Sequence, residues 1–143
     1  MTSTVCIVDT NVVVSGLITP ASTTPPTMIL DSMLAGRLLY LMSVELLTEY
    51  SSVLRRPRIA RTHGLADEQL DRLLTELVAN AMWREIPGTV RAPDRGDDHL
   101  WALLTGYPQA LLATGDRLLL NNPPVECPVI SPRTFVNSFL NIE

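Results

Sequence analysis

The chain has 143 residues, 46% of them hydrophobic and 18% charged, which indicates one folded globular domain rather than two. All eleven basic residues are arginine, and the absence of lysine excludes both a Walker-type phosphate loop and Schiff-base chemistry. The net charge of −4 argues against a protein that binds nucleic acid over its whole surface, but it does not exclude a local basic patch.

The first half of the chain alternates between short apolar runs and helical patterns. Residues 5–8 are continuously apolar, as in a strand that is buried on both faces of a parallel sheet. A loop rich in proline and threonine precedes a helix that is expected over residues 27–34. Residues 38–42 form a second apolar run, and Ser43 is then expected to cap a helix that Pro57 ends.

The second half continues in the same way. In chain order we expect a helix over 67–81, a strand over 82–86, a helix over 97–104, strands over 110–113 and 125–130, and a helix over 132–140. Strands that alternate with helices, without a repeat or a linker, are typical of an α/β domain. We therefore predict a three-layer α/β/α domain whose central, mostly parallel sheet has about five strands.

The sequence contains no zinc-finger or membrane signal. The two cysteines, Cys6 and Cys127, form no paired motif of the zinc-finger kind. The apolar run near the N-terminus is too short for a signal peptide, and no window approaches the roughly 18 apolar residues of a membrane span. We therefore expect a cytoplasmic protein without membrane attachment.

Acidic residues stand where an open α/β sheet binds ligands, beyond the carboxyl ends of its strands. Asp9 directly follows the first expected strand, Asp116 comes three residues after the end of the strand expected over 110–113, and Glu49 lies on the helix after another strand. Asp97 and Asp98 begin the helix before the fourth strand. Any one of these acids could also merely cap a loop or a helix, because negative charge is favoured at a helix N-terminus.

Several carboxylates at one edge would repel one another. Two unit charges about 4 Å apart repel by about 4 kcal/mol at an effective dielectric constant near 20. In a chain without lysine, the candidates that can offset this repulsion are arginine and a divalent metal. Oxygen ligands suit Mg²⁺ or Mn²⁺, and such ions activate water and clamp a phosphodiester during in-line displacement.

Five short sequence segments, distributed from residue 8 to residue 135, match the motifs of a known family. They are VDTNVVVS at 8–15, SVELLTEY with VLRRP at 43–57, DDHLWAL at 97–103, ATGDRLL at 113–119 and SPRTF at 131–135. In this order they resemble the PIN-domain ribonucleases, most closely the VapC-related bacterial branch of toxins from toxin–antitoxin pairs. Each segment alone is weak evidence, whereas five in order are a strong signal. The resemblance implies a single PIN-like domain over residues 1–143.

The resemblance also implies which acids are catalytic and bind the metal: Asp9, Glu49, Asp98 and Asp116. Asp98 is chosen over Asp97 because apolar residues follow it, from Leu100 to Ala102, as they follow the third acid of the family. Asp97 is kept as an alternative ligand or supporting carboxylate. Adjacent helical residues differ by about 100° in direction, so both cannot face one metal equally.

Three polar residues match family positions that flank the metal and hold carboxylates or water: Thr10, Asn11 and Thr114. One segment departs from the family, which often shows Asp-Pro-x-Asp-Asp where this chain has Pro93-Asp94-Arg95-Gly96 before the paired aspartates. This departure puts the role of Asp94 in question, and a helix cap is its better interpretation.

Four of the eleven arginines lie within seven positions: Arg55, Arg56, Arg58 and Arg61. Such a cluster is commonly a solvated helix face. It can also contact phosphates beside a metal site, which would let an acidic protein bind RNA. Neither histidine is needed as a ligand: we interpret His63 as a loop residue and His99 as a surface residue of a helix.

The resemblance implies a Mg²⁺- or Mn²⁺-dependent endoribonuclease that cleaves RNA, is neutralised as a toxin by a cognate antitoxin protein, and forms a homodimer or a larger oligomer. The alternative is a catalytically silent PIN-like module that binds RNA or a protein partner.

A haloacid-dehalogenase-like phosphatase also has an aspartate after its first strand. It requires a second acid two positions on, where this chain has Asn11, and a lysine. A receiver domain likewise requires a lysine.

Overall fold

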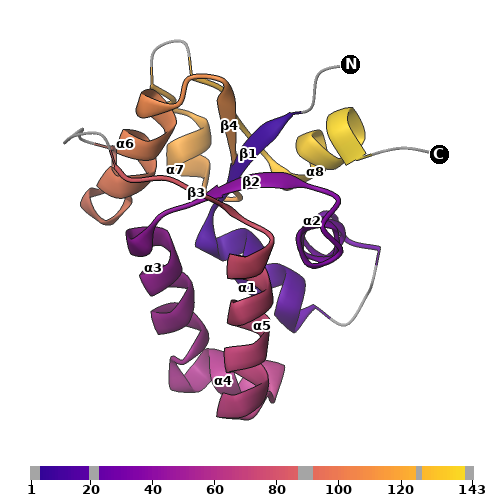
Figure 1. Cartoon of the computed structure of the whole chain (residues 1–143). Helices are drawn as coiled ribbons and strands as arrows, with labels where there is room; N and C mark the ends of the chain where they lie inside the picture. Colours follow the sequence, from indigo (N-terminus) through magenta and orange to yellow (C-terminus); the bar gives the residue numbers. More distant parts are fainter. Residues whose placement is uncertain (1–3, 20–22, 87–91, 125–126, 141–143) are drawn as a thin grey trace.

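A five-stranded parallel sheet forms the centre of the structure, a computed structural model that describes residues 4–19, 23–86, 92–124 and 127–140 (Figure 1). Within these residues the strands are β1 (Val5–Val8), β2 (Leu39–Met42), β3 (Met82–Trp83), β4 (Ala110–Ala113) and β5 (Val129–Ile130). Their order across the sheet is β3-β2-β1-β4-β5, and every pair is parallel. The predicted three-layer α/β/α fold is confirmed.

The pairing of β1 differs on its two sides. β1 pairs with β4 along its whole length, from Val5 opposite Ala110 to Val8 opposite Ala113. It pairs with β2 only at its first two residues. The chain leaves β1 toward β2 and later returns to the other side of β1 as β4, so the strand order switches between β1 and β4. Open α/β sheets bind ligands at the carboxyl ends of the strands that flank such a switch.

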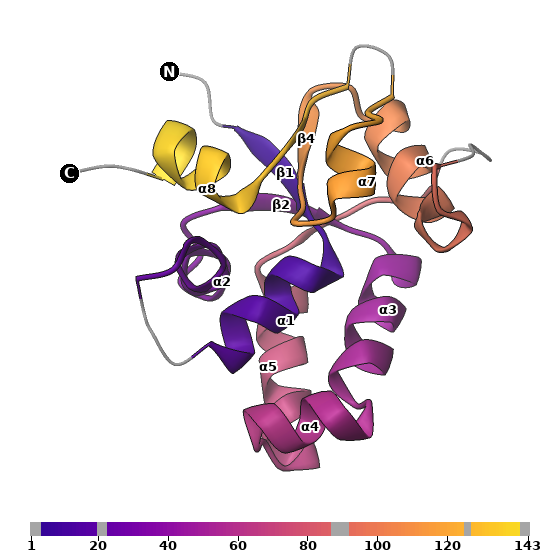
Figure 2. The same ribbon diagram turned by 180° about the vertical axis from the view of Figure 1, so that it is seen from behind.

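Helices cover both faces of the sheet. In the described ranges they are α1 (Thr10–Ile18), α2 (Pro25–Leu34), α3 (Val44–Leu54), α4 (Pro57–His63), α5 (Asp67–Ala79), α6 (Asp98–Gly106), α7 (Arg117–Leu120) and α8 (Pro132–Phe135). A 3₁₀ turn, η1 (Arg95–Asp97), precedes α6, and a π-helical segment, η2 (Val136–Leu140), follows α8. Figures 1 and 2 show α1, α2 and α5 on one side of the strands and α6 with α7 on the other. Across the described residues, no helix has the length and apolarity of a membrane span.

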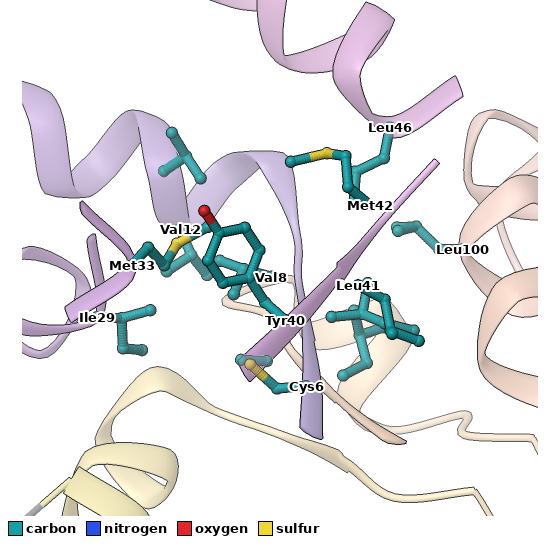
Figure 3. Close-up of a cluster of buried hydrophobic side chains, with 14 of the residues drawn as sticks. Cys6, Val8, Val12, Ile29, Met33, Tyr40, Leu41, Met42, Leu46 and Leu100 are labelled. Carbon is teal, nitrogen blue, oxygen red and sulfur yellow. The ribbon is translucent and has the colours of Figure 1, made fainter. Parts of the chain in front are cut away.

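Strand β2 packs against both helical layers. Successive residues of a strand point to opposite faces, and Figure 3 shows Tyr40 beside Met33 of α2, whereas Leu41 points toward the side of Leu100 of α6. Tyr40 is completely buried, and its hydroxyl donates to the carbonyl of Leu77 on α5 at 2.6 Å. The aromatic ring therefore fills the core while its polar end keeps the partner that burial requires.

Of the three described helices that begin at prolines, α2 and α4 do so where the sequence predicted a loop or a helix end. α2 starts at Pro25, two residues before the expected start, and its N-cap Thr24 accepts a hydrogen bond from the N–H of Thr27. Pro57 follows the end of α3 at Leu54, as expected, but it also begins α4, which was not expected. Proline fits the first turn of a helix because its missing N–H would have no intrahelical partner there.

Helix α1 was not predicted from the sequence. Its run Val12–Val14 is β-branched, which is less favourable in a helix than in a strand. Asp9 caps the helix by accepting the N–H of Thr10 at 2.7 Å. Val12 and its neighbour Val13 are buried in the core. Capping and packing therefore override a weak local preference.

Other expected elements are present with different ends. The strands expected over 82–86 and 125–130 are reduced to two residues each, and the first two positions of the second lie outside the described residues. α5 ends at Ala79, two residues early. The expected C-terminal helix changes from α to π geometry after Phe135.

Gly16 lets α1 and α2 cross closely. A Cβ atom at this position would lie 2.7 Å from the carbonyl oxygen of Pro26 and 3.1 Å from the Cβ of Leu30. Both atoms are fixed by the backbone of α2, so neither can rotate away. Any side chain at Gly16 would therefore push the two helices apart.

We expect Gly16→Ala to lower the free energy of unfolding. Alanine is favoured over glycine inside a helix by about 1 kcal/mol, whereas overpacking of a core costs about 1–3 kcal/mol. Because the clash is with backbone, we expect a net loss of about 1–2 kcal/mol in urea unfolding. Gly96→Ala is the control, since its Cβ would meet no atom closer than 3.6 Å. Wild-type stability of Gly16→Ala would show that the helices can separate at little cost.

Candidate functional site

Asp9 lies at the carboxyl end of β1 and is only 4% exposed. Its Oδ1 accepts the backbone N–H of Thr10 at 2.7 Å. Its Oδ2 accepts the Thr114 hydroxyl at 2.7 Å and the Asn11 amide at 3.0 Å. Burial raises the pKa of Asp9 above its ordinary value, although the hydrogen bonds from Thr114 and Thr10 act in the opposite direction. The polar residues selected from the sequence thus surround this carboxylate.

Glu49 reaches the same place from α3. Its Oε1 accepts the Thr10 hydroxyl at 2.7 Å and lies 3.5 Å from Nε2 of His99. Burial alone would raise the pKa of Glu49, but hydrogen bonds from His99 and Thr10, with the charge of Arg56, keep it below its ordinary value. Among the described residues, no hydrogen-bond donor contacts Oε2. The carboxylate is therefore held through one oxygen while the other is available.

Tyr50 fixes α3 against the end of β1. Its hydroxyl donates to the carbonyl of Val8, the residue before Asp9, and its side chain is completely buried. Burial raises the pKa of Tyr50, and the negative charge of Asp9 adds to this effect, so the phenol keeps the proton that it donates. Because Tyr50 directly follows Glu49, this bond holds the backbones of the two acids in register.

Asp116 follows β4 and is the N-cap of α7. Its N–H donates to the Thr114 hydroxyl at 3.0 Å, and the N–H of Gly115 donates to Oδ1 of Asn11 at 3.0 Å. These bonds join the loop after β4 to the residues after β1. Asp116 is close enough to Asp9 for its charge to raise the pKa of that acid.

Asp97 joins this group from the segment before β4. It lies in η1, is 9% exposed, and accepts no side-chain hydrogen bond from any of the described residues. Burial raises the pKa of Asp97 to about 7, and the negative charges of Asp9 and three further acids add to this effect. A buried carboxylate that has no donor and faces other acids is unstable in its charged form unless a cation is near.

Asp98, which the sequence favours over Asp97 as a metal ligand, contacts the preceding loop through one of its oxygens. Its Oδ1 accepts the N–H of Ala92 at 2.8 Å. Asp97 and Asp98 differ in their contacts because η1 ends at Asp97 and α6 begins only at Asp98, so the two residues do not continue one regular helix. Asp94 caps η1 by accepting the N–H of Gly96 at 3.0 Å, in agreement with its interpretation as a cap.

The structure corrects the interpretation of both histidines. The His99 side chain is only 15% exposed, not a surface residue, and turns Nε2 toward Glu49. Its Nδ1 is buried without a hydrogen-bond partner among the described residues. His63 is not in a loop but ends α4, where Nε2 contacts the carbonyl of Leu54 at 2.9 Å and Nδ1 accepts the N–H of Leu65. His99 is the site residue that sequence reasoning missed, because its partner lies on a distant helix.

The four clustered arginines do not form one group. Arg55 pairs with Asp71 at 2.6 Å and with Asp67 at 3.3 Å, so it joins the end of α3 to α5. Arg56 instead lines a hollow of about 440 Å³ beside the acids. The other two are exposed on α4: Arg58 and Arg61.

The converging acids offer only oxygen ligands: Asp9, Glu49, Asp97 and Asp116. As placed, no three His, Cys, Asp or Glu side chains of the described residues form a ready coordination group. The donor chemistry nevertheless fits a hard divalent cation such as Mg²⁺ or Mn²⁺. The raised pKa values of Asp9 and Asp97 agree with this fit, because a cation would relieve the repulsion that contributes to them.

Comparison with known families agrees with this arrangement. A family model described as PIN domain matches residues 5–118, which include all four converging acids. A search among curated proteins gave no match. The matched segment covers most of the chain and contains both strands that flank the switch in strand order. The chain therefore belongs to the PIN-domain family.

Proposed function

We propose that this protein is a metal-dependent endoribonuclease whose divalent cation, Mg²⁺ or Mn²⁺, is held by the four converging acids. PIN domains are typically metal-dependent nucleases. The observation that carries the proposal is Asp97, a buried carboxylate without a donor that gathers with three other acids at the carboxyl edge of the sheet. Asp98 is not included, because its charge is not among those that act on Asp9, Glu49 or Asp97, and its Oδ1 accepts the N–H of Ala92.

The residues of the chain orient the carboxylates. Thr114 and Asn11 hold Asp9, and Thr10 holds Glu49. Hydrogen bonds to a charged carboxylate lower its pKa, so these donors favour the deprotonated form that binds a cation. When bound, the cation would supply the positive charge that activates water and stabilises the charge developing on a phosphodiester.

The resemblance of the five segments to the VapC-related branch supports a more specific role for the nuclease. We propose that the substrate is RNA, which the PIN-domain match also supports. We further propose that the protein acts in the cell as a toxin, as a homodimer or a larger oligomer, and that a cognate antitoxin protein neutralises it.

Expression of the chain by itself should then arrest growth, whereas the Asp9→Asn variant should not, because it removes one carboxylate from the site. Growth curves after induction, with matched protein levels, measure the difference. Equal growth with both proteins would contradict the role as a catalytic toxin.

Cleavage assays should distinguish the two neighbouring aspartates. The wild type should cleave single-stranded RNA with Mn²⁺ or Mg²⁺ and not with EDTA. Asp97→Asn should slow single-turnover cleavage by at least about 100-fold, because loss of a group that merely supports a ligand already costs about 10–100-fold. Asp98→Asn is the matched control and should cleave near the wild-type rate.

An inactive Asp98→Asn beside an active Asp97→Asn would restore the choice made from the sequence. A wild-type protein that binds RNA but does not cleave it with either metal would favour the catalytically silent module instead.

The raised pKa of Asp97 also predicts how stability depends on pH without metal. An unfolded aspartate loses its proton near pH 4, whereas Asp97 in the folded protein keeps its proton to about pH 7. Between these values the folded state binds more protons, so the contribution of Asp97 lowers the free energy of unfolding as the pH rises. In EDTA, Asp97→Asn should therefore melt at a higher temperature than the wild type at pH 8, with little difference at pH 4.

Asp98→Asn should follow the wild-type curve in the same thermal scans, because the charge of Asp98 is not among those that raise the pKa of Asp97 and an asparagine can still accept the N–H of Ala92. If Asp97→Asn melts below the wild type at pH 8, Asp97 does not carry the repulsion inferred from its position.

A further inference from the structure

A hollow of about 440 Å³ opens beside Glu49, between the exposed face of α3 and the start of α6. Thr48 and Ser52 of α3 line it on one side, and His99 of α6 lines it on the other. Arg56, just beyond the end of α3, also lines it. The hollow therefore adjoins the acids through Glu49 and contains a cation that the proposed metal site does not use.

Arg56 differs from its neighbour in the sequence. Arg55 is committed to two carboxylates of α5, Asp67 and Asp71. Among the described residues, no carboxylate lies within ion-pair distance of Arg56. Its guanidinium is nevertheless near enough to Glu49 for its charge to lower the pKa of that acid. The side chain is exposed, so an anion from solution can reach it.

The two ends of the hollow carry opposite charges. Glu45 begins the lining on the first turn of α3, and Arg56 lies beyond the last turn. A phosphate would be repelled at the Glu45 end and attracted at the Arg56 end. Ser52 lies in the last turn of α3, four positions before Arg56, and its hydroxyl makes no hydrogen bond with the described residues. This hydroxyl supplies a second donor for a phosphate.

We propose that Arg56 binds a backbone phosphate of the RNA strand in this hollow, next to the phosphate that lies at the acids. The inference rests on the proposed nuclease function. A guanidinium can donate two parallel hydrogen bonds to one phosphate, and such a contact positions a strand without reading its sequence. Arg58 and Arg61 do not line the hollow, so the proposal does not extend to them.

Binding of a fluorescein-labelled, twelve-nucleotide single-stranded RNA in EDTA tests this contact, since cleavage is then blocked. Arg56→Ala should raise the Kd about tenfold, as expected for a lost charge-assisted pair. It should also reduce the slope of log Kd against log salt by about 0.7, the value for one phosphate on a single strand. Arg72→Ala removes the same charge from the exposed surface of α5 and should change neither quantity.

Single-turnover cleavage with Mn²⁺ gives the second readout. Arg56→Ala should raise the RNA concentration for half-maximal rate and leave the rate at saturating RNA near that of the wild type. Arg56→Lys should restore the salt slope but only part of the affinity, because an ammonium keeps the charge without the paired geometry.

The outcomes separate the two proposals. If the wild type binds and cleaves RNA but Arg56→Ala behaves like Arg72→Ala, the phosphate contact is overturned and the nuclease function stands. If the wild type neither binds nor cleaves RNA, both are overturned. A tenfold loss of affinity that leaves the salt slope unchanged would also overturn the contact, since it would mean that the variant had lost no ion pair with a phosphate.

Discussion

Carboxylates that are held close together repel one another, and this fold gathers four of them at one edge of its sheet. Much of the polar structure around that edge responds to this repulsion. Asp9 accepts three hydrogen bonds, and Glu49 accepts a hydroxyl and faces a histidine. Asp97 receives no such donor from the described residues, and burial together with the neighbouring negative charges raises its pKa. A cation beside Asp97 would therefore favour its charged form and stabilise the folded protein.

The geometry of the first two acids is set by a reciprocal pair of contacts. Thr10, which follows Asp9, donates its hydroxyl to Glu49. Tyr50, which follows Glu49, donates its hydroxyl to Val8, which precedes Asp9. Each acid is thus positioned by the sequence neighbour of the other. One bond holds the Glu49 carboxylate itself, and the other fixes α3 against the backbone just before Asp9, so the two acids keep a defined spacing.

The sheet and the general location of the acids could be predicted because buried parallel strands give apolar runs and their carboxyl ends share one edge. The sequence could not predict which of two adjacent residues of the same type faces the site. Asp97 and Asp98 differ in their contacts, because a 3₁₀ turn replaces the first turn of the expected helix. Arg55 and Arg56 likewise separate, one toward α5 and one toward Glu49. Two adjacent residues of the same type look alike in the sequence. Which way each side chain points depends on the exact residue at which the helix begins or ends.

The hydrogen bond from Thr114 to Asp9 joins residues 105 positions apart. It is made only after β4 has paired with β1 along its length, so the first acid stays without its main side-chain donor until the fourth strand has been synthesised and inserted. Asp9, Glu49 and Asp97 precede Thr114 in the chain, whereas Asp116 follows it. A growing chain on the ribosome therefore cannot assemble the complete group of four acids early. Fragments that stop before residue 114 lack both this threonine and the last acid, so the group is complete only when the domain is nearly finished.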